Sequence, residues 1–206
     1  MDTRATRRRG FGAEVMRLDL AALQAIMPNA GANAARFLEP LADAMEEFDI
    51  ATPARQAAFL AQVAHESGEL RFVLEGATGE AYEGNVHLGN VHPGDGPLFK
   101  GRGLIQITGR KNYQLCGAAL AIDLVAQPEL LEEPVYACRS AAWFWTEGAG
   151  LNLSRRAREH GVKENCNLND LADAGDFEGI TLAINGGLNG QPDRLAHLER
   201  AQGALA

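Results

Sequence analysis

Apolar residues recur at helical spacing in two long stretches of the chain. Residues 33–49 place five of them along one face, despite Pro40 within the stretch: Phe37, Leu38, Leu41, Met45 and Phe48. Residues 53–67 follow a strong start signal, since Thr52 can cap a helix whose first position is Pro53. We therefore expect helices over both ranges.

Helical patterns continue on both sides of a glycine-rich middle segment. Further helices are predicted at 18–27, at about 110–121 after a Thr108 cap, from Pro134, from an Asp176 cap to Asn185, and after Pro192. Residues 75–103 hold eight glycines, too many for a helix. A loop of that length inside a compact domain is usually functional. With Leu104–Ile107 as a possible short strand, the predicted class is mainly α.

Charge divides the chain into a short basic arm and an acidic body. The 206 residues carry a net charge of −8, yet residues 1–17 hold five arginines and only two acids. The arm could touch an anionic surface, although a solvated terminus is the simpler reading. We expect residues 18–206 to form one domain. Its acidity argues against nucleic acid as a partner.

The composition also limits where the protein works. The sequence has no apolar run of about 18 residues, so we expect no stable membrane association, and its N-terminus lacks the apolar part of a signal peptide. Synthesis in the cytoplasm is therefore expected. The three cysteines are widely spaced and show no C-x-x-C pair, which favours free thiols.

The pair His65-Glu66 is the first candidate for chemistry. A zinc protease needs a second histidine one turn later, but that position is Glu69. We predict no metal and no cofactor. Glu66 follows Phe59 by seven residues and so lies on the same apolar stripe of its helix. Desolvation there favours a protonated carboxyl, which suits a general acid, although a solvated helix-end glutamate remains an alternative.

Hydrolysis of a glycosidic bond by acid and base needs a second carboxylate. The glycine-rich loop offers Glu75, Glu80, Glu83 and Asp95, and spacing alone does not rank them. Beyond the loop, Gln106 and Thr108 stand among apolar neighbours, where their polar groups need a partner. Near the other end of the chain, Asn185 precedes two glycines, a pattern that is also a common helix cap.

Taken together and in this order, these segments resemble glycoside hydrolase family 19, the chitinase-like enzymes. The segments are His65-Glu66-Ser67, Tyr82-Glu83-Gly84, the stretch G-R-G-L-I-Q-I-T-G from Gly101 with Asn112-Tyr113, and Ile184-Asn185-Gly186-Gly187. The resemblance covers roughly residues 50–200 and is strongest to the branch found in phage and prophage endolysins. It implies a lysozyme-like α+β fold with a very small β element and a glycine-rich active-site loop.

The resemblance also implies roles for individual residues. Glu66 would be the general acid and Glu83 the general base of an inverting reaction, with Glu75 as the rival base. Thr108 would orient water. Substrate contacts would come from His65, Tyr82, Arg102, Gln106, Asn112, Tyr113 and Asn185. Arg194 would support the base through a carboxylate relay, although the relay's acidic position reads Asn189 here.

For substrate, we favour the glycan strands of peptidoglycan, with chitin oligomers as the alternative. The short chain and free cysteines suit a monomeric lysis enzyme that reaches the cell wall, in the periplasm, after release by another protein. A non-catalytic glycan-binding relative, a helical interaction domain and a lytic transglycosylase with a single glutamate remain as alternatives. The run Trp143-Phe144-Trp145 is expected in the core rather than on a sugar-stacking surface.

Overall fold

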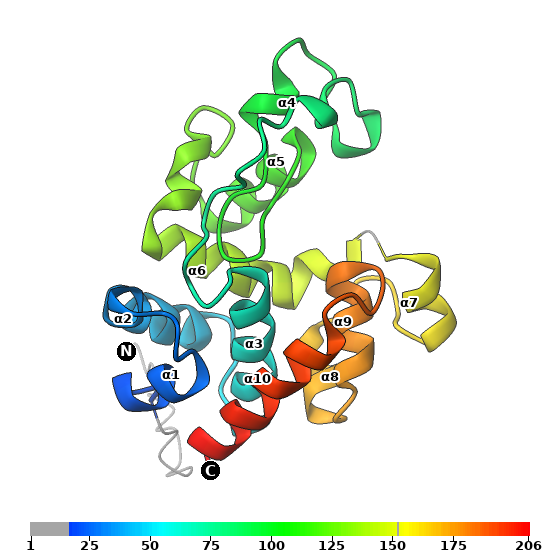
Figure 1. Ribbon diagram of the computed structural model, residues 1–206. Helices are drawn as coiled ribbons and strands as arrows, with labels where there is room; N and C mark the ends of the chain where they lie inside the picture. Colours follow the sequence, from blue (N-terminus) through cyan, green and yellow to red (C-terminus); the bar gives the residue numbers. More distant parts are fainter. Residues whose placement is uncertain (1–16, 152) are drawn as a thin grey trace, which may run out of the picture.

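The computed structural model describes residues 17–151 and 153–206 (Figure 1). The arginine-rich arm expected over 1–17 lies outside the described residues, apart from Arg17, which pairs with Glu39 and Asp43 at 2.6 and 2.8 Å. The fold is mainly helical, as predicted. Its α-helices are α1 (Leu20–Ile26), α2 (Ala32–Glu47), α3 (Pro53–Glu66), α4 (Asp95–Leu98), α5 (Arg110–Leu120), α6 (Pro134–Trp143), α7 (Arg155–His160), α8 (Leu168–Asp173), α9 (Phe177–Asn185) and α10 (Gln191–Ala204).

Helix α3 is the centre of the larger part of the molecule. Nine consecutive residues of it, 56–64, are buried, because α10 lies along one side while α1 and α8 pack on others. Phe59 on α3 meets Trp145 edge to face, with ring centroids 5.5 Å apart. Thr52 caps α3 as predicted, accepting from the backbone N–H of Arg55 at 3.2 Å. Because most of α3 is buried, the position of its last residue, Glu66, is fixed by the packing of the helix.

A smaller part, built from residues 74–124, rises above α3 and α9 (Figure 1). It contains the glycine-rich segment, within which lie 3-10 turns at Glu80–Tyr82 and Val86–Leu88 and the short helix α4. Helix α5 follows this segment. A second apolar cluster holds it together, with Phe99 and Tyr113 in edge-to-face contact at 5.2 Å. The two parts meet along α6 and the π turn Phe144–Gly148 that continues it.

Two local predictions were wrong. Leu104–Ile107 is a turn rather than a strand, because Gln106 adopts a left-handed φ of 56° and lets Arg102 and Ile107 pair with each other. Thr108 does not cap α5: Gly109 holds that position, and the Thr108 hydroxyl donates back to the Gln106 carbonyl at 2.9 Å. The chain therefore doubles back just before α5, which exposes polar side chains where a strand would have paired.

Expectations about helices α2 and α9 and about the cysteines were confirmed. Helix α2 runs through Pro40 without a break, and Asp176 caps α9 at the N–H of Gly179, 2.8 Å away. Gly186, with φ of 72°, ends α9. Cys116, Cys138 and Cys166 are free thiols. Within the described ranges, no helix is long and apolar enough to cross a bilayer, and no group of three or more metal-binding side chains is assembled.

Candidate active site

Glu66 is the last residue of α3 and lines a pocket of about 310 Å³. About one fifth of its side chain is exposed. Its Oε1 atom is buried and lies 2.6 Å from Nη2 of Arg194. The two groups form an ion pair, but no N–H of the guanidinium points at Oε1 as a hydrogen bond would require. A carboxylate paired with a cation on its buried side leaves the other oxygen, Oε2, to act in the pocket.

Arg194 is buried and held on three sides. In addition to its ion pair with Glu66, its guanidinium donates hydrogen bonds to the side-chain oxygen of Gln62 and, at 3.2 Å, to the carbonyl of Asn189. Gln62 in turn donates to the Thr181 hydroxyl at 2.9 Å. Arg194 thus contacts Glu66, the predicted acid, and not Glu83, the residue that it was predicted to support. Asn189 takes part only through its backbone.

A second contact joins α3 and α10 next to this ion pair. Nδ1 of His65 lies 2.7 Å from Oδ2 of Asp193, and this hydrogen bond lowers the pKa of Asp193. Gly190 packs on the same imidazole so closely that a Cβ there would lie 2.2 Å from Cε1. His65 thus faces α10 rather than the pocket. Sequence reasoning missed Asp193, Gly190 and Gln62, whose partners are far away in the chain.

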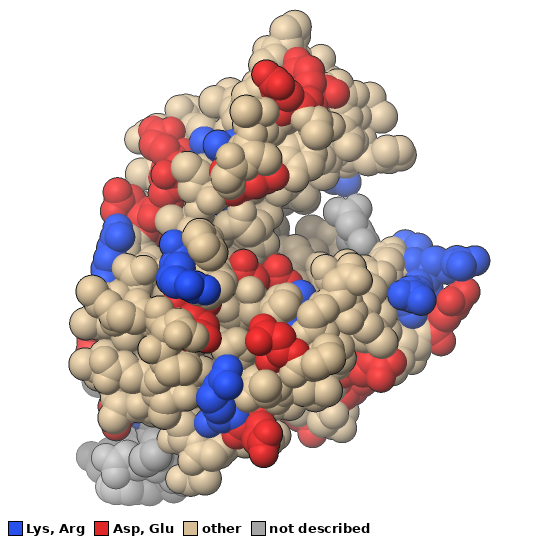
Figure 2. Space-filling model, in the orientation of Figure 1, with Lys and Arg blue, Asp and Glu red and all other residues tan. Residues whose placement is uncertain are grey.

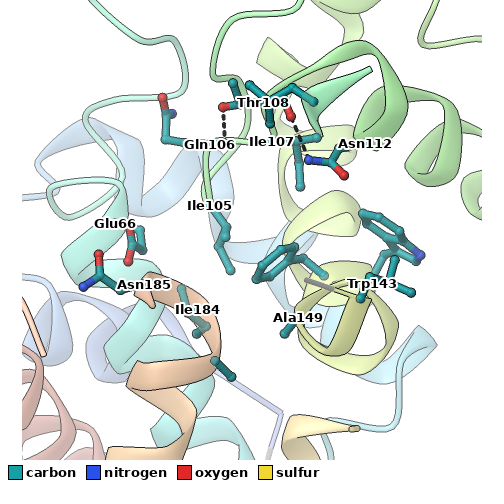
Figure 3. A pocket seen from close by; sticks show the side chains of 15 residues that line it. Glu66, Ile105, Gln106, Ile107, Thr108, Asn112, Trp143, Ala149, Ile184 and Asn185 are labelled. Atoms are coloured by element: carbon teal, nitrogen blue, oxygen red, sulfur yellow. Dashed lines mark hydrogen bonds between the residues drawn. The ribbon is translucent and has the colours of Figure 1, made fainter. Parts of the chain in front are cut away.

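The opposite wall of the pocket carries three of the predicted polar residues (Figure 3). Gln106 donates to the Gly103 carbonyl at 2.9 Å, and Asn112 donates to the Thr108 carbonyl at 2.8 Å. These bonds use the amide nitrogens, so the side-chain oxygens of Gln106 and Asn112 remain as acceptors. Figure 3 places Asn185 beside Glu66, on the near wall. The structure therefore brings Glu66, Gln106, Thr108, Asn112 and Asn185 together.

Apolar side chains complete the pocket. Ile105, Ile184, Trp143 and Phe144 line it together with the polar groups. The expectation that the whole Trp-Phe-Trp run is core holds for Trp145, which is fully buried, but Trp143 and Phe144 also line the pocket. A pocket with an apolar floor and polar walls is typical of a site for a small polar ligand such as a sugar unit.

Glu83 is exposed and already bound to its own loop. Its two carboxylate oxygens accept from the backbone N–H groups of Gly94 and Gly96, at 2.7 and 2.8 Å. It does not line the pocket that Glu66 faces. The carboxylate of Glu83 therefore organises the turn that leads into α4.

Glu75 is half-buried and lies nearer the pocket wall. It accepts from the Tyr82 hydroxyl and from the Gly101 N–H, both at 2.9 Å. A Cβ on Gly101 would lie 2.8 Å from Oε1 of Gln106 and 3.2 Å from Oε2 of Glu75, so both side chains crowd the same glycine. The bond to the carboxylate raises the pKa of Tyr82. Glu75 thus lies close to Gln106, which lines the pocket.

Arg102 and Tyr113 brace the loop from inside. Arg102 donates to Glu132 at 2.8 Å and to the Tyr113 hydroxyl at 3.1 Å, and that hydroxyl donates to the Lys100 carbonyl at 2.6 Å. Burial raises the pKa of Tyr113 to about 12. Neither side chain lines the pocket that Glu66 faces, and both support the loop through these bonds.

Comparison with known proteins places this chain in a family. A family model described as chitinase class I matches residues 29–200. Chitinase 11 of Oryza sativa subsp. japonica is 42% identical over 91 residues, which make up 43% of this chain and 34% of that protein. Endochitinase At2g43590 of Arabidopsis thaliana is 34% identical over 116 residues, 55% of this chain and 41% of that protein. The matched region thus spans less than half the length of these curated relatives.

Solved structures agree on the fold. Chitinase C from Streptomyces griseus HUT6037 superimposes with a TM-score of 0.70 at 23% identity, covering 96% of this chain and 79% of that one. A bacterial family 19 chitinase gives 0.72 at 24% identity, covering 93% and 96%. The family model and the shared fold together identify the chain as a member of the chitinase class I family, glycoside hydrolase family 19.

Proposed function

We propose that this protein hydrolyses β-1,4 bonds between N-acetylated amino sugars, with Glu66 as general acid. The observation that carries the proposal is the placing of Glu66, at the end of a buried helix and facing a pocket with amide and hydroxyl groups on the opposite wall. General acids need a fixed position near the leaving oxygen. The amide groups of Gln106, Asn112 and Asn185 suit the hydroxyl and acetamide groups of such sugars.

In the proposed step, the carboxyl group of Glu66 gives its proton to the glycosidic oxygen as the bond to the anomeric carbon breaks. The carboxylate left behind then faces Arg194, whose positive charge stabilises it. A water attacks from the other face of the sugar and gives its proton to a second carboxylate.

Glu75 is the better supported second carboxylate. Both carboxylates accept two hydrogen bonds from the loop, so the difference between them is one of position. Glu75 lies beside Gln106 at the pocket wall, whereas Glu83 is bound to the turn of Gly94 and Gly96 and does not line the pocket. We therefore assign the base to Glu75 and leave Glu83 a structural role, which reverses the order that the sequence suggested.

Chitin is the first substrate to test, because the relatives bear the names of chitinases. Peptidoglycan, the polymer that the sequence favours, is the second candidate. It is supported by Arg156, an exposed arginine against the turn that holds the pocket residue Asn185. Membership of the endolysin branch, action on the cell wall after release, and a monomeric state belong with this second candidate.

The test is product analysis with wild type and Glu66→Gln on a chitin hexamer and on purified peptidoglycan. Loss of the acid lowers the rate by about 100-fold or more, while Glu80→Gln, an exposed loop control, leaves it unchanged. Reducing sugar products support the proposal. Anhydro-sugar products would indicate a transglycosylase, and binding of glycan without turnover would indicate a non-catalytic relative; either result would overturn it.

A further inference from the structure

Helix α7 packs on α9, and a cluster of positive charge lies where α7 forms the right edge of the molecule (Figure 2). Two of its arginines have acidic partners: Arg155 lies 3.6 Å from Glu159, and Arg158 lies 3.3 Å from Glu164. Arg156 is exposed and makes no ion pair with any acid among residues 17–151 and 153–206. A guanidinium with five donors is thus open to solvent in a protein of net charge −8.

Arg156 lies against the turn that holds Asn185. A Cβ placed on Gly187 would be 3.7 Å from Nη1 of Arg156 and 4.0 Å from Nδ2 of Asn185. The start of α7 touches the same turn, since a Cβ on Gly186 would lie 3.4 Å from Cβ of Ser154. Asn185 itself lines the pocket with Glu66. Only the turn at Gly186 and Gly187 therefore separates the guanidinium of Arg156 from the pocket residue Asn185, and these two glycines have no side chains to stand in between.

We propose that Arg156 binds carboxylate groups attached to a glycan in the pocket and so favours an acidic glycan over a neutral one. This inference rests on the proposed function. Chitin offers only hydroxyl and acetamide groups, but the lactyl-peptide substituents of peptidoglycan carry carboxylates. A guanidinium binds a carboxylate through two parallel hydrogen bonds, which fixes the orientation of the bound group as well as its charge. The bound chain would then place its substituted sugar beside Asn185.

The test compares Arg156→Gln with wild type on three soluble substrates. These are peptidoglycan fragments with free carboxylates, the same fragments after amidation of those carboxylates, and a chitin hexamer. For the acidic fragments, kcat/KM falls by about three- to ten-fold, mainly through KM, as expected for a partly exposed charge-assisted pair. The amidated fragments and the hexamer are cleaved equally well by both proteins. Arg155→Gln, the neighbouring control at 88% exposure, changes nothing.

Each other outcome has a defined meaning. An equal loss on all three substrates would show that Arg156 only supports the turn, and no loss on the acidic fragments would show that it binds no carboxylate. Either result overturns the inference and leaves the proposed function standing, as does a wild type that cleaves only the hexamer. A wild type that cleaves neither polymer would overturn the inference and the proposed function together.

Discussion

Gly190 offers a sharp test of how the acid is positioned. It precedes α10 with φ of 71°, and a Cβ there would lie 2.2 Å from Cε1 and 2.5 Å from Nε2 of His65. Real Cβ atoms do not approach other atoms so closely, so in Gly190→Ala the imidazole must move. Because the ring is bound to Asp193 and precedes Glu66 in the chain, we expect its movement to disturb the end of α3.

The expected cost has two parts. An L-residue in the left-handed region loses about 1–2 kcal/mol relative to glycine. Displacing a packed ring costs roughly a further 1–3 kcal/mol. Gly175→Ala is a matched control, since its φ is 72° but nothing lies within 4 Å of the added Cβ. In a domain of this size 1 kcal/mol lowers Tm by about 2–4 °C. The displaced ring should therefore lower Tm by at least about 2 °C more than the control does.

Thermal unfolding and hexamer kinetics measure the two consequences. Gly175→Ala should keep the wild-type kcat, while Gly190→Ala should lose about tenfold or more, since misplacement by about 1 Å can cost that much. Equal unfolding temperatures for the two variants, together with a wild-type kcat for Gly190→Ala, would refute this expectation. Imidazole packing would then play no part in placing Glu66.

Two further predictions concern carboxylates of the loop. Glu75→Gln should lower kcat by about 100-fold, whereas Glu83→Gln should lower mainly Tm; the reverse pattern in parallel assays would return the base to Glu83. Arg110 lowers the pKa of Asp95 to about 2, so its ionic contribution is complete above the unfolded value near 4 and is lost as pH falls through 2. In urea unfolding, the free energy of unfolding of Asp95→Asn should thus be much lower than that of wild type at pH 6 but nearly equal to it at pH 2. A difference in unfolding free energy that stays the same at both pH values would contradict this.

Local chemistry was readable from the sequence where the signal was local. Thr52 and Asp176 cap their helices because a side-chain oxygen needs only a nearby N–H, three residues away. The helical spacing through Pro40 was also sufficient, since the apolar face of α2 is buried on both sides of it. Glu66 followed from the same periodicity, which placed it at the end of a stripe that the structure buries.

Contacts between distant segments could not be read in this way. Asp193 stands 128 positions from His65, and no local pattern marks the pairing. The surroundings of Glu83 show the same limit: its neighbours in sequence match a motif, but the N–H groups that bind its carboxylate belong to Gly94 and Gly96, 11 and 13 positions away. The left-handed Gln106 likewise depends on the bonds that its turn makes, where hydrophobic alternation suggested a strand.

The two walls of the pocket are fixed by different means, and this bears on how the site can vary. On one side, His65 meets Asp193 and Glu66 meets Arg194, two contacts between adjacent pairs of residues. Two such contacts restrain both the rotation and the shift of α10 against α3, so the position of Glu66 depends on helix packing in the core. On the other side, Gln106 and Thr108 depend on short bonds within a turn. Substitutions in that turn should therefore alter the polar wall of the pocket while Glu66 stays in place.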